Sequence, residues 1–102
     1  MAENIRDSTL TIGTISVVLV LQHIPGERTA LAITNTSTAG QTLSMAWGKV
    51  AVAGQGVVLY PGGSWSESID SRFTPSEKEV QTVSSAAGGT AAIHVRTVGT
   101  GL

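Results

Sequence analysis

The chain has 102 residues, no cysteine and a formal net charge of -1 at pH 7. This length suits one domain with a single core. The nearly neutral charge and the lack of any basic run disfavour a nucleic-acid partner, since affinity for phosphates is mainly cationic. Without cysteine, the sequence excludes a disulfide framework, a thiol nucleophile and a cysteine-ligated zinc site.

The N-terminal part begins with a polar segment, 1–8, which we expect to be an arm without a secretion signal. The run 15–21 is too short to span a bilayer, so no membrane span is predicted. Its side chains are apolar on both faces of a strand, which predicts cover from both sides. We expect one set to face the domain's own core and the other to face a partner or the arm. The first set is Val17, Leu19 and Leu21, and the second is Val18 and Val20.

Further strands are predicted wherever apolar and polar residues alternate between turn residues. Their ranges are 28–34, 41–47, 57–60, 65–69, 80–84 and 91–98. The glycine-rich segment 48–56 is predicted to be a loop with a weak edge strand through Val50 and Val52. The apolar members of the alternations give the predicted core. They are Leu31, Ile33, Leu43, Met45, Trp47, Leu59, Ile93 and Val95.

The pattern as a whole predicts an all-β protein with about seven or eight strands. No segment is long enough for a helix that would connect parallel strands, so the sheets should be antiparallel. The turn spacing indicates a single antiparallel β-sandwich or jelly roll over 9–102, preceded by the arm 1–8.

Residues with catalytic or metal-binding chemistry are few and scattered. His23 and His94 fall on different strands or strand ends, and they are interpreted as surface or interface imidazoles rather than metal ligands. Glu67 and Asp70 would fall on opposite faces of a regular strand, so solvated charges are favoured over a glycosidase pair. We therefore predict no catalytic residues, no metal and no cofactor, and hence no enzyme.

Two short motifs have alternative interpretations. Tyr60 and Trp65 flank a Pro-Gly-Gly turn and are the one pair suited to stacking on a sugar ring. The triplet Asn35-Thr36-Ser37 matches a glycosylation acceptor, but a turn is the favoured interpretation.

Three segments carry a resemblance to a known group. They are Arg-x-x-Leu-x-Ile-x-Asn-x-Ser from Arg28, Gly-Val-x-Leu-x-Pro-Gly-Gly-Ser-Trp from Gly56, and Ile-x-Val-x-x-Val from Ile93. Together they resemble the small β-sandwich accessory proteins of bacteriophage virions, such as head decoration proteins, spike or fibre bases and vertex pentons.

That resemblance implies a non-enzymatic structural protein of a virus particle, assembled in the host cytoplasm. Its partners would be copies of itself, as a homo-oligomer, and the major capsid protein or other virion proteins. The alternative is a carbohydrate- or receptor-binding sandwich module. For the first function, the residues expected at a subunit interface are Ile5 and Arg6 of the arm and Val18 and Val20 of the following strand.

Overall fold

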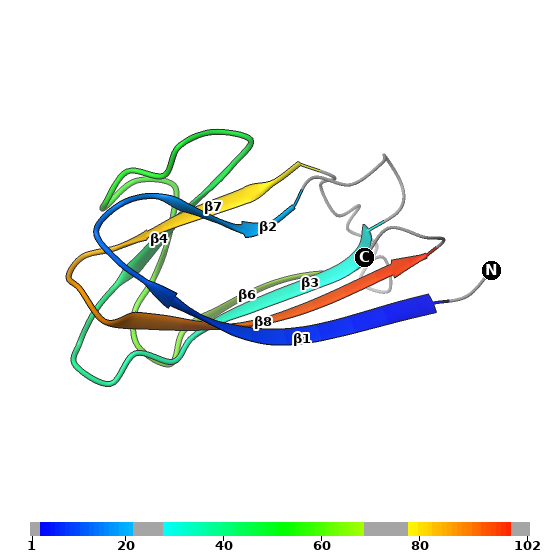
Figure 1. Cartoon of the computed structure of the whole chain (residues 1–102), viewed down its shortest axis with the longest axis horizontal. Helices are drawn as coiled ribbons and strands as arrows, with labels where there is room; N and C mark the ends of the chain where they lie inside the picture. Colours follow the sequence, from blue (N-terminus) through cyan, green and yellow to red (C-terminus); the bar gives the residue numbers. More distant parts are fainter. Residues whose placement is uncertain (1–2, 22–27, 69–77, 99–102) are drawn as a thin grey trace.

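The computed structural model describes residues 3–21, 28–68 and 78–98, which form two packed four-stranded antiparallel sheets (Figure 1). The predicted all-β antiparallel sandwich is therefore confirmed. Sheet A has the strand order β1-β8-β3-β6 and sheet B the order β2-β7-β4-β5. The strands are β1 (Glu3–Ile12), β2 (Val17–Val20), β3 (Arg28–Asn35), β4 (Leu43–Trp47), β5 (Val57–Leu59), β6 (Ser64–Ser68), β7 (Val80–Ser84) and β8 (Gly89–Val98).

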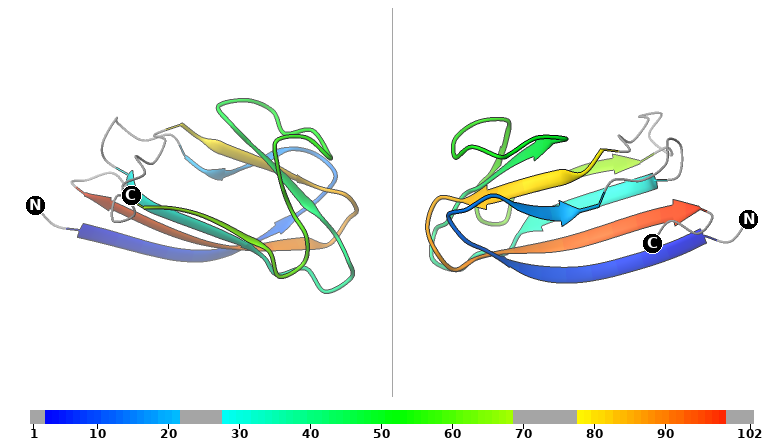
Figure 2. Two further views of the ribbon diagram at one scale, coloured as in Figure 1. Left: turned by 180° about the vertical axis from the view of Figure 1, so that it is seen from behind. Right: turned by 45° about the horizontal axis from the view of Figure 1, so that its top comes forward.

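The chain crosses between the sheets at almost every connection, and only β4 and β5 form a hairpin within one sheet. The two longest strands, β1 and β8, come from opposite ends of the sequence and pair along their whole length, from Glu3 opposite Val98 to Ile12 opposite Gly89. In both views of Figure 2 these two strands lie side by side along sheet A. The segment from Glu3 to residue 8, expected to be an arm, is thus the first half of β1.

The core lies between the inner faces of the two sheets. Seven of the eight predicted core residues are buried there, and the eighth, Trp47, is partly buried and packs against them. The core also contains residues that the alternation did not single out, including Ile12, Val80 and Ala91. Burying these side chains supplies most of the apolar stabilisation that a domain of this size can obtain.

The alternation predicted for β2 is wrong at several positions because the strand contains an irregularity. The pairing register with β7 shifts between Val18 and Val20. A bulge changes which face the following side chains occupy. Leu19 and Val20 are therefore both buried, whereas Leu21 is exposed and Val17 and Val18 are partly exposed.

The loop 48–56 covers the outer face of sheet B and contains no strand. Its backbone N–H of Ala51 donates to Ser16 Oγ at 3.0 Å, and that of Gly54 donates to Ser44 Oγ at 2.9 Å. A small apolar cluster of Ala46, Ala51 and Val83 lies beneath it. The predicted weak edge strand is thus replaced by a packed cover, whose exposed residues Val50 and Val52 point away from it.

Candidate functional site

Each sheet ends in two outer strands, which are β1 and β6 in sheet A and β2 and β5 in sheet B. Short connections join β1 to β2 through 13–16 and β5 to β6 through 60–63, so each pair of outer strands shares one lateral side of the sandwich. Along an outer strand, alternate N–H and C=O groups point away from the sheet and are able to pair with another strand. The described part of the chain therefore has two lateral sides at which a strand of another molecule can add.

The β2 edge combines an open backbone with apolar side chains. Val18 is 40% exposed and lies opposite Gln81 in the β2–β7 ladder. Leu21, just beyond the strand, is exposed as well. Val20 was predicted to face the same partner, but it is 4% exposed and belongs to the core of this chain.

The β1 edge also presents residues that the sequence singled out. Ile5 is 56% exposed on the outer face of sheet A, opposite Arg96 of β8. Arg6 is exposed and its side chain points to the other face of the strand. The structure thus places Ile5, Arg6 and Val18 at open strand edges on the same lateral side, which no single sequence segment indicated.

The β6 edge has a different character. Its residues Ser64 and Ser66 are exposed and belong to the outer face of sheet A, where they align with Thr34 and Ala32 of β3. The inner face of the strand carries Trp65 and Glu67. No bulky or charged side chain of β6 stands on its outer face, so an approaching strand meets only serine hydroxyls there.

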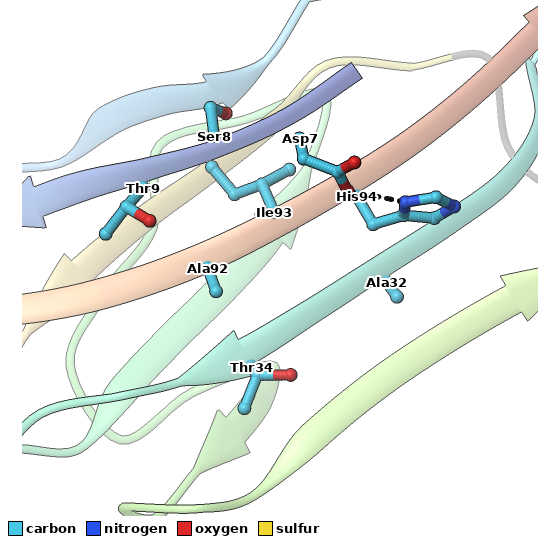
Figure 3. A pocket seen from close by; sticks show the side chains of 8 residues that line it. All are labelled: Asp7, Ser8, Thr9, Ala32, Thr34, Ala92, Ile93 and His94. Carbon is cyan, nitrogen blue, oxygen red and sulfur yellow. Dashed lines mark hydrogen bonds and ion pairs between the residues drawn. The ribbon is translucent and has the colours of Figure 1, made fainter. Parts of the chain in front are cut away.

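An open hollow of about 310 Å³ lies on the outer face of sheet A. Figure 3 shows Ala32 and Ala92 on its floor and the His94 ring beside Asp7 of the neighbouring strand. The Nδ1 of His94 and the Oδ1 of Asp7 are 2.7 Å apart. In the described ranges, no group of three or more histidine, aspartate or glutamate side chains is arranged to hold a metal ion. The outward position predicted for His94 is confirmed.

The carboxylate and histidine pairs weighed from the sequence are not brought together in the described residues. Glu67 is buried on the inner face of β6. Its suggested partner Asp70 lies outside the described residues, as does His23. The prediction that Glu67 is a solvated charge is wrong, because β6 turns this position toward the space between the sheets.

Tyr60 and Trp65, the suggested sugar-stacking pair, are turned to different environments. Tyr60 is 70% exposed next to the turn. Trp65 faces inward, packs edge-to-face on Trp47 with ring centroids 5.7 Å apart, and donates its indole N–H to Glu67. Trp65 therefore belongs to the interior of the sandwich, where a sugar ring has no access to its face.

No protein-family model matches the chain, and no curated protein matches it. The chain is similar to a solved structure of Bacillus endospore appendages, which are described as a novel family of disulfide-linked pili. The superposition has a TM-score of 0.56 with 18% sequence identity, and it covers 94% of this chain and 86% of the other. At this identity the likeness establishes a shared fold.

This finding overturns the resemblance to bacteriophage virion proteins. The solved structure that shares the fold belongs to a bacterial pilus, so the predictions of a virion protein, of a capsid partner and of a location in the virus particle are wrong. The strand and turn motifs from Arg28 and Gly56 are common to hairpin-rich sandwiches and do not distinguish one assembly from another. Within the described residues, no helix is long and apolar enough to cross a membrane. The fold found here is thus that of a protein that belongs to a bacterial surface polymer.

Proposed function

We propose that this chain is a non-enzymatic structural subunit that polymerises with copies of itself into an extracellular fibre of the spore-appendage type. The observation that carries this proposal is the fold likeness to the appendage structure, which extends over nearly the whole of both chains. The open edges on both lateral sides support it, because a subunit with complementary edges on opposite sides adds to itself without limit.

The subunits of this fibre are joined without disulfide bonds. The related appendages are described as disulfide-linked, whereas this chain has no cysteine. Its joints therefore consist of backbone hydrogen bonds and apolar contacts. A fibre of this kind dissociates in detergent with or without a reducing agent, and reductant alone leaves it intact.

We assign the main joint to β2 of one copy and β6 of the next. A head-to-tail contact pairs opposite lateral sides, and of the two strands on the far side β6 has five residues and β5 has three. The five residues of β6 match the length of β2 better, and the serines on its outer face leave its edge open. Val18 becomes covered in this joint, and Ile5 and Arg6 of β1 lie on the same side as a second contact.

Electron microscopy and light scattering of the purified chain test the proposal. We expect filaments or a concentration-dependent series of oligomers, insensitive to reductant. The variant Val18→Lys places a charge in the joint and should abolish polymerisation while the circular dichroism spectrum stays that of a folded sheet protein. The matched control is Val50→Lys, which is exposed on the loop 48–56 rather than at an edge. A wild-type chain that stays monomeric at all concentrations contradicts the function.

The choice of strands has its own test, made unambiguous by the lack of native cysteine. Mixing a Val18→Cys chain with a Ser66→Cys chain under oxidising conditions should give a cross-linked heterodimer. Mixing Val50→Cys with Ser66→Cys should not. Equal cross-linking in both mixtures would show that the contact is random collision and would exclude the β2–β6 joint.

A further inference from the structure

A polar cluster lies inside the sandwich, between the inner faces of β6 and β4. Glu67 is 5% exposed and stands opposite Leu31, a core residue of β3. Its Oε2 accepts a hydrogen bond from Trp65 Nε1 at 3.2 Å. Trp65 in turn packs on Trp47 of the opposite sheet, with the ring planes at 67°. An acidic side chain is therefore held within an otherwise aliphatic and aromatic layer.

Two polar atoms of this cluster are buried and have no hydrogen-bond partner among the described residues. They are the Oε1 of Glu67 and the Nε1 of Trp47. One is an acceptor and the other a donor, and they belong to the two side chains that contact Trp65 from opposite sheets. Buried polar groups in native proteins almost always have a partner, either a protein group or an ordered water molecule. The pair of atoms therefore points to a bound group that both donates and accepts.

We propose that this cluster is an internal hydration site, in which ordered water donates to Glu67 Oε1 and accepts from Trp47 Nε1. Water has this dual capacity and is small enough for a packed interior. A metal or ammonium ion fits less well, because the indole N–H presents a positive hydrogen to it. The negative charge of Glu67 is moreover not isolated, since the guanidinium of Arg28 is buried on the adjacent strand β3.

Nuclear magnetic resonance tests the site directly, because the chain has two tryptophans and therefore two indole N–H signals. Water held at Trp47 should give a cross-relaxation peak between its indole hydrogen and the water resonance, with the sign of a long-lived contact. The variant Trp65→Phe assigns the remaining signal to Trp47. A Trp47 indole hydrogen without this peak, in a chain that is folded, overturns the proposal.

The role of Glu67 is tested by comparing two replacements with a matched control. Glu67→Gln retains a carbonyl oxygen as an acceptor and should retain the water peak. Glu67→Leu removes the acceptor and should abolish the peak, while Ser66→Ala on the outer face should leave it unchanged. A peak of full intensity in Glu67→Leu would show that Glu67 does not hold the water.

A crystal structure at a resolution that shows ordered solvent gives an independent reading. Density for a water molecule within hydrogen-bond distance of Oε1 supports the site, and direct bonding of Oε1 and Nε1 to protein groups refutes it. The spectroscopic test applies to the dispersed chain in solution and to a fibre in the solid state. A failure of the proposed polymerisation is thus distinguishable from a failure of the hydration site.

Discussion

The two ends of β3 fasten the two sheets together in different ways. At the C-terminal end, the Asn35 side chain donates from Nδ2 to Gln41 O at 2.9 Å and to Leu59 O at 2.8 Å. Its Oδ1 accepts from Ser37 N at 3.0 Å. Every polar atom of this fully buried side chain is therefore paired, and the groups it pairs with precede β4, end β5 and follow β3.

At the N-terminal end, Arg28 reaches across the sandwich. One of its guanidinium nitrogens, Nη2, donates to Leu21 O and to Lys78 O, both at 3.0 Å, and so ties the end of β2 and the approach to β7 to sheet A. The nearby Glu67 keeps one buried oxygen without a partner among the described residues. A closed network lies at one end and a polar interior with spare hydrogen-bonding capacity at the other.

This difference has an energetic consequence. Removing one member of a saturated buried network leaves its partners unpaired, which costs more than the bond itself contributed. Removing a buried polar group that already lacks a partner relieves a penalty, so it costs little or stabilises. We therefore expect the two ends to respond to substitution very differently.

The largest effect is expected for Asn35→Leu. Two carbonyl oxygens and one N–H lose their partner together, which should lower the free energy of unfolding by about 3–5 kcal/mol. Urea denaturation of the dispersed chain measures this loss. The control Thr36→Val removes a neighbouring hydroxyl that is bonded only to Thr90 at the surface, and it should cost less than about 1 kcal/mol. A tolerated Asn35→Leu would show that the C-terminal end is not fastened by this side chain.

A smaller loss is expected for Arg28→Met. Methionine keeps much of the buried stem and leaves the two carbonyl oxygens of Leu21 and Lys78 without this donor, at a cost of about 2–3 kcal/mol. Arg28→Lys should recover part of the loss because the ammonium group is able to donate to one of them. Equal losses in both variants would mean that packing of the stem, rather than hydrogen bonding, fastens this end.

For Glu67→Leu we expect a change within about 1 kcal/mol of wild type, with stabilisation as the favoured sign, since one buried oxygen is unpaired from the start. Thermal unfolding followed by circular dichroism measures it. The indole of Trp65 loses its acceptor in this variant, which sets the limit to the gain. A loss comparable with that of Asn35→Leu would show that Glu67 is as well paired as Asn35.

The smallest effect is expected for Asp7→Asn on the outer face of sheet A. The Asp7 and His94 side chains are 72% and 38% exposed, and solvent screens their interaction. Exposed pairs of this kind contribute below about 0.5 kcal/mol. Unfolding curves of the variant and wild type at low salt should nearly coincide. A large shift would show that this pair, and not the ladder of backbone hydrogen bonds, holds β1 on β8.

Several features followed from the sequence because they depend on local pattern. The alternation around Leu31, Ile33 and Ile93 fixed which side chains face inward, since the side-chain period of a strand is two. The turn interpretation of the triplet at Asn35 agrees with the buried, fully bonded side chain found there. The absence of cysteine determined in advance that any assembly of this chain is free of disulfides.

Function was not predictable in the same way. The motifs from Arg28 and Gly56 encode strands and turns, and any sandwich with these strands and turns satisfies them. They therefore carried the fold correctly and the identity of the assembly wrongly. The candidate interface was recognised only in part, because Val18 lies at an open edge whereas Val20, two residues on, belongs to the core.

What the tertiary structure alone decided is which strands are neighbours and which are left at the edges. The pairing of β1 with β8 joins segments more than 75 residues apart along most of its length, and no local pattern specifies a partner at that distance. The bulge in β2 and the inward turn of Glu67 on β6 follow from those pairings. Sequence therefore set the faces of the strands by their period, while long-range pairing set the edges and the buried charge.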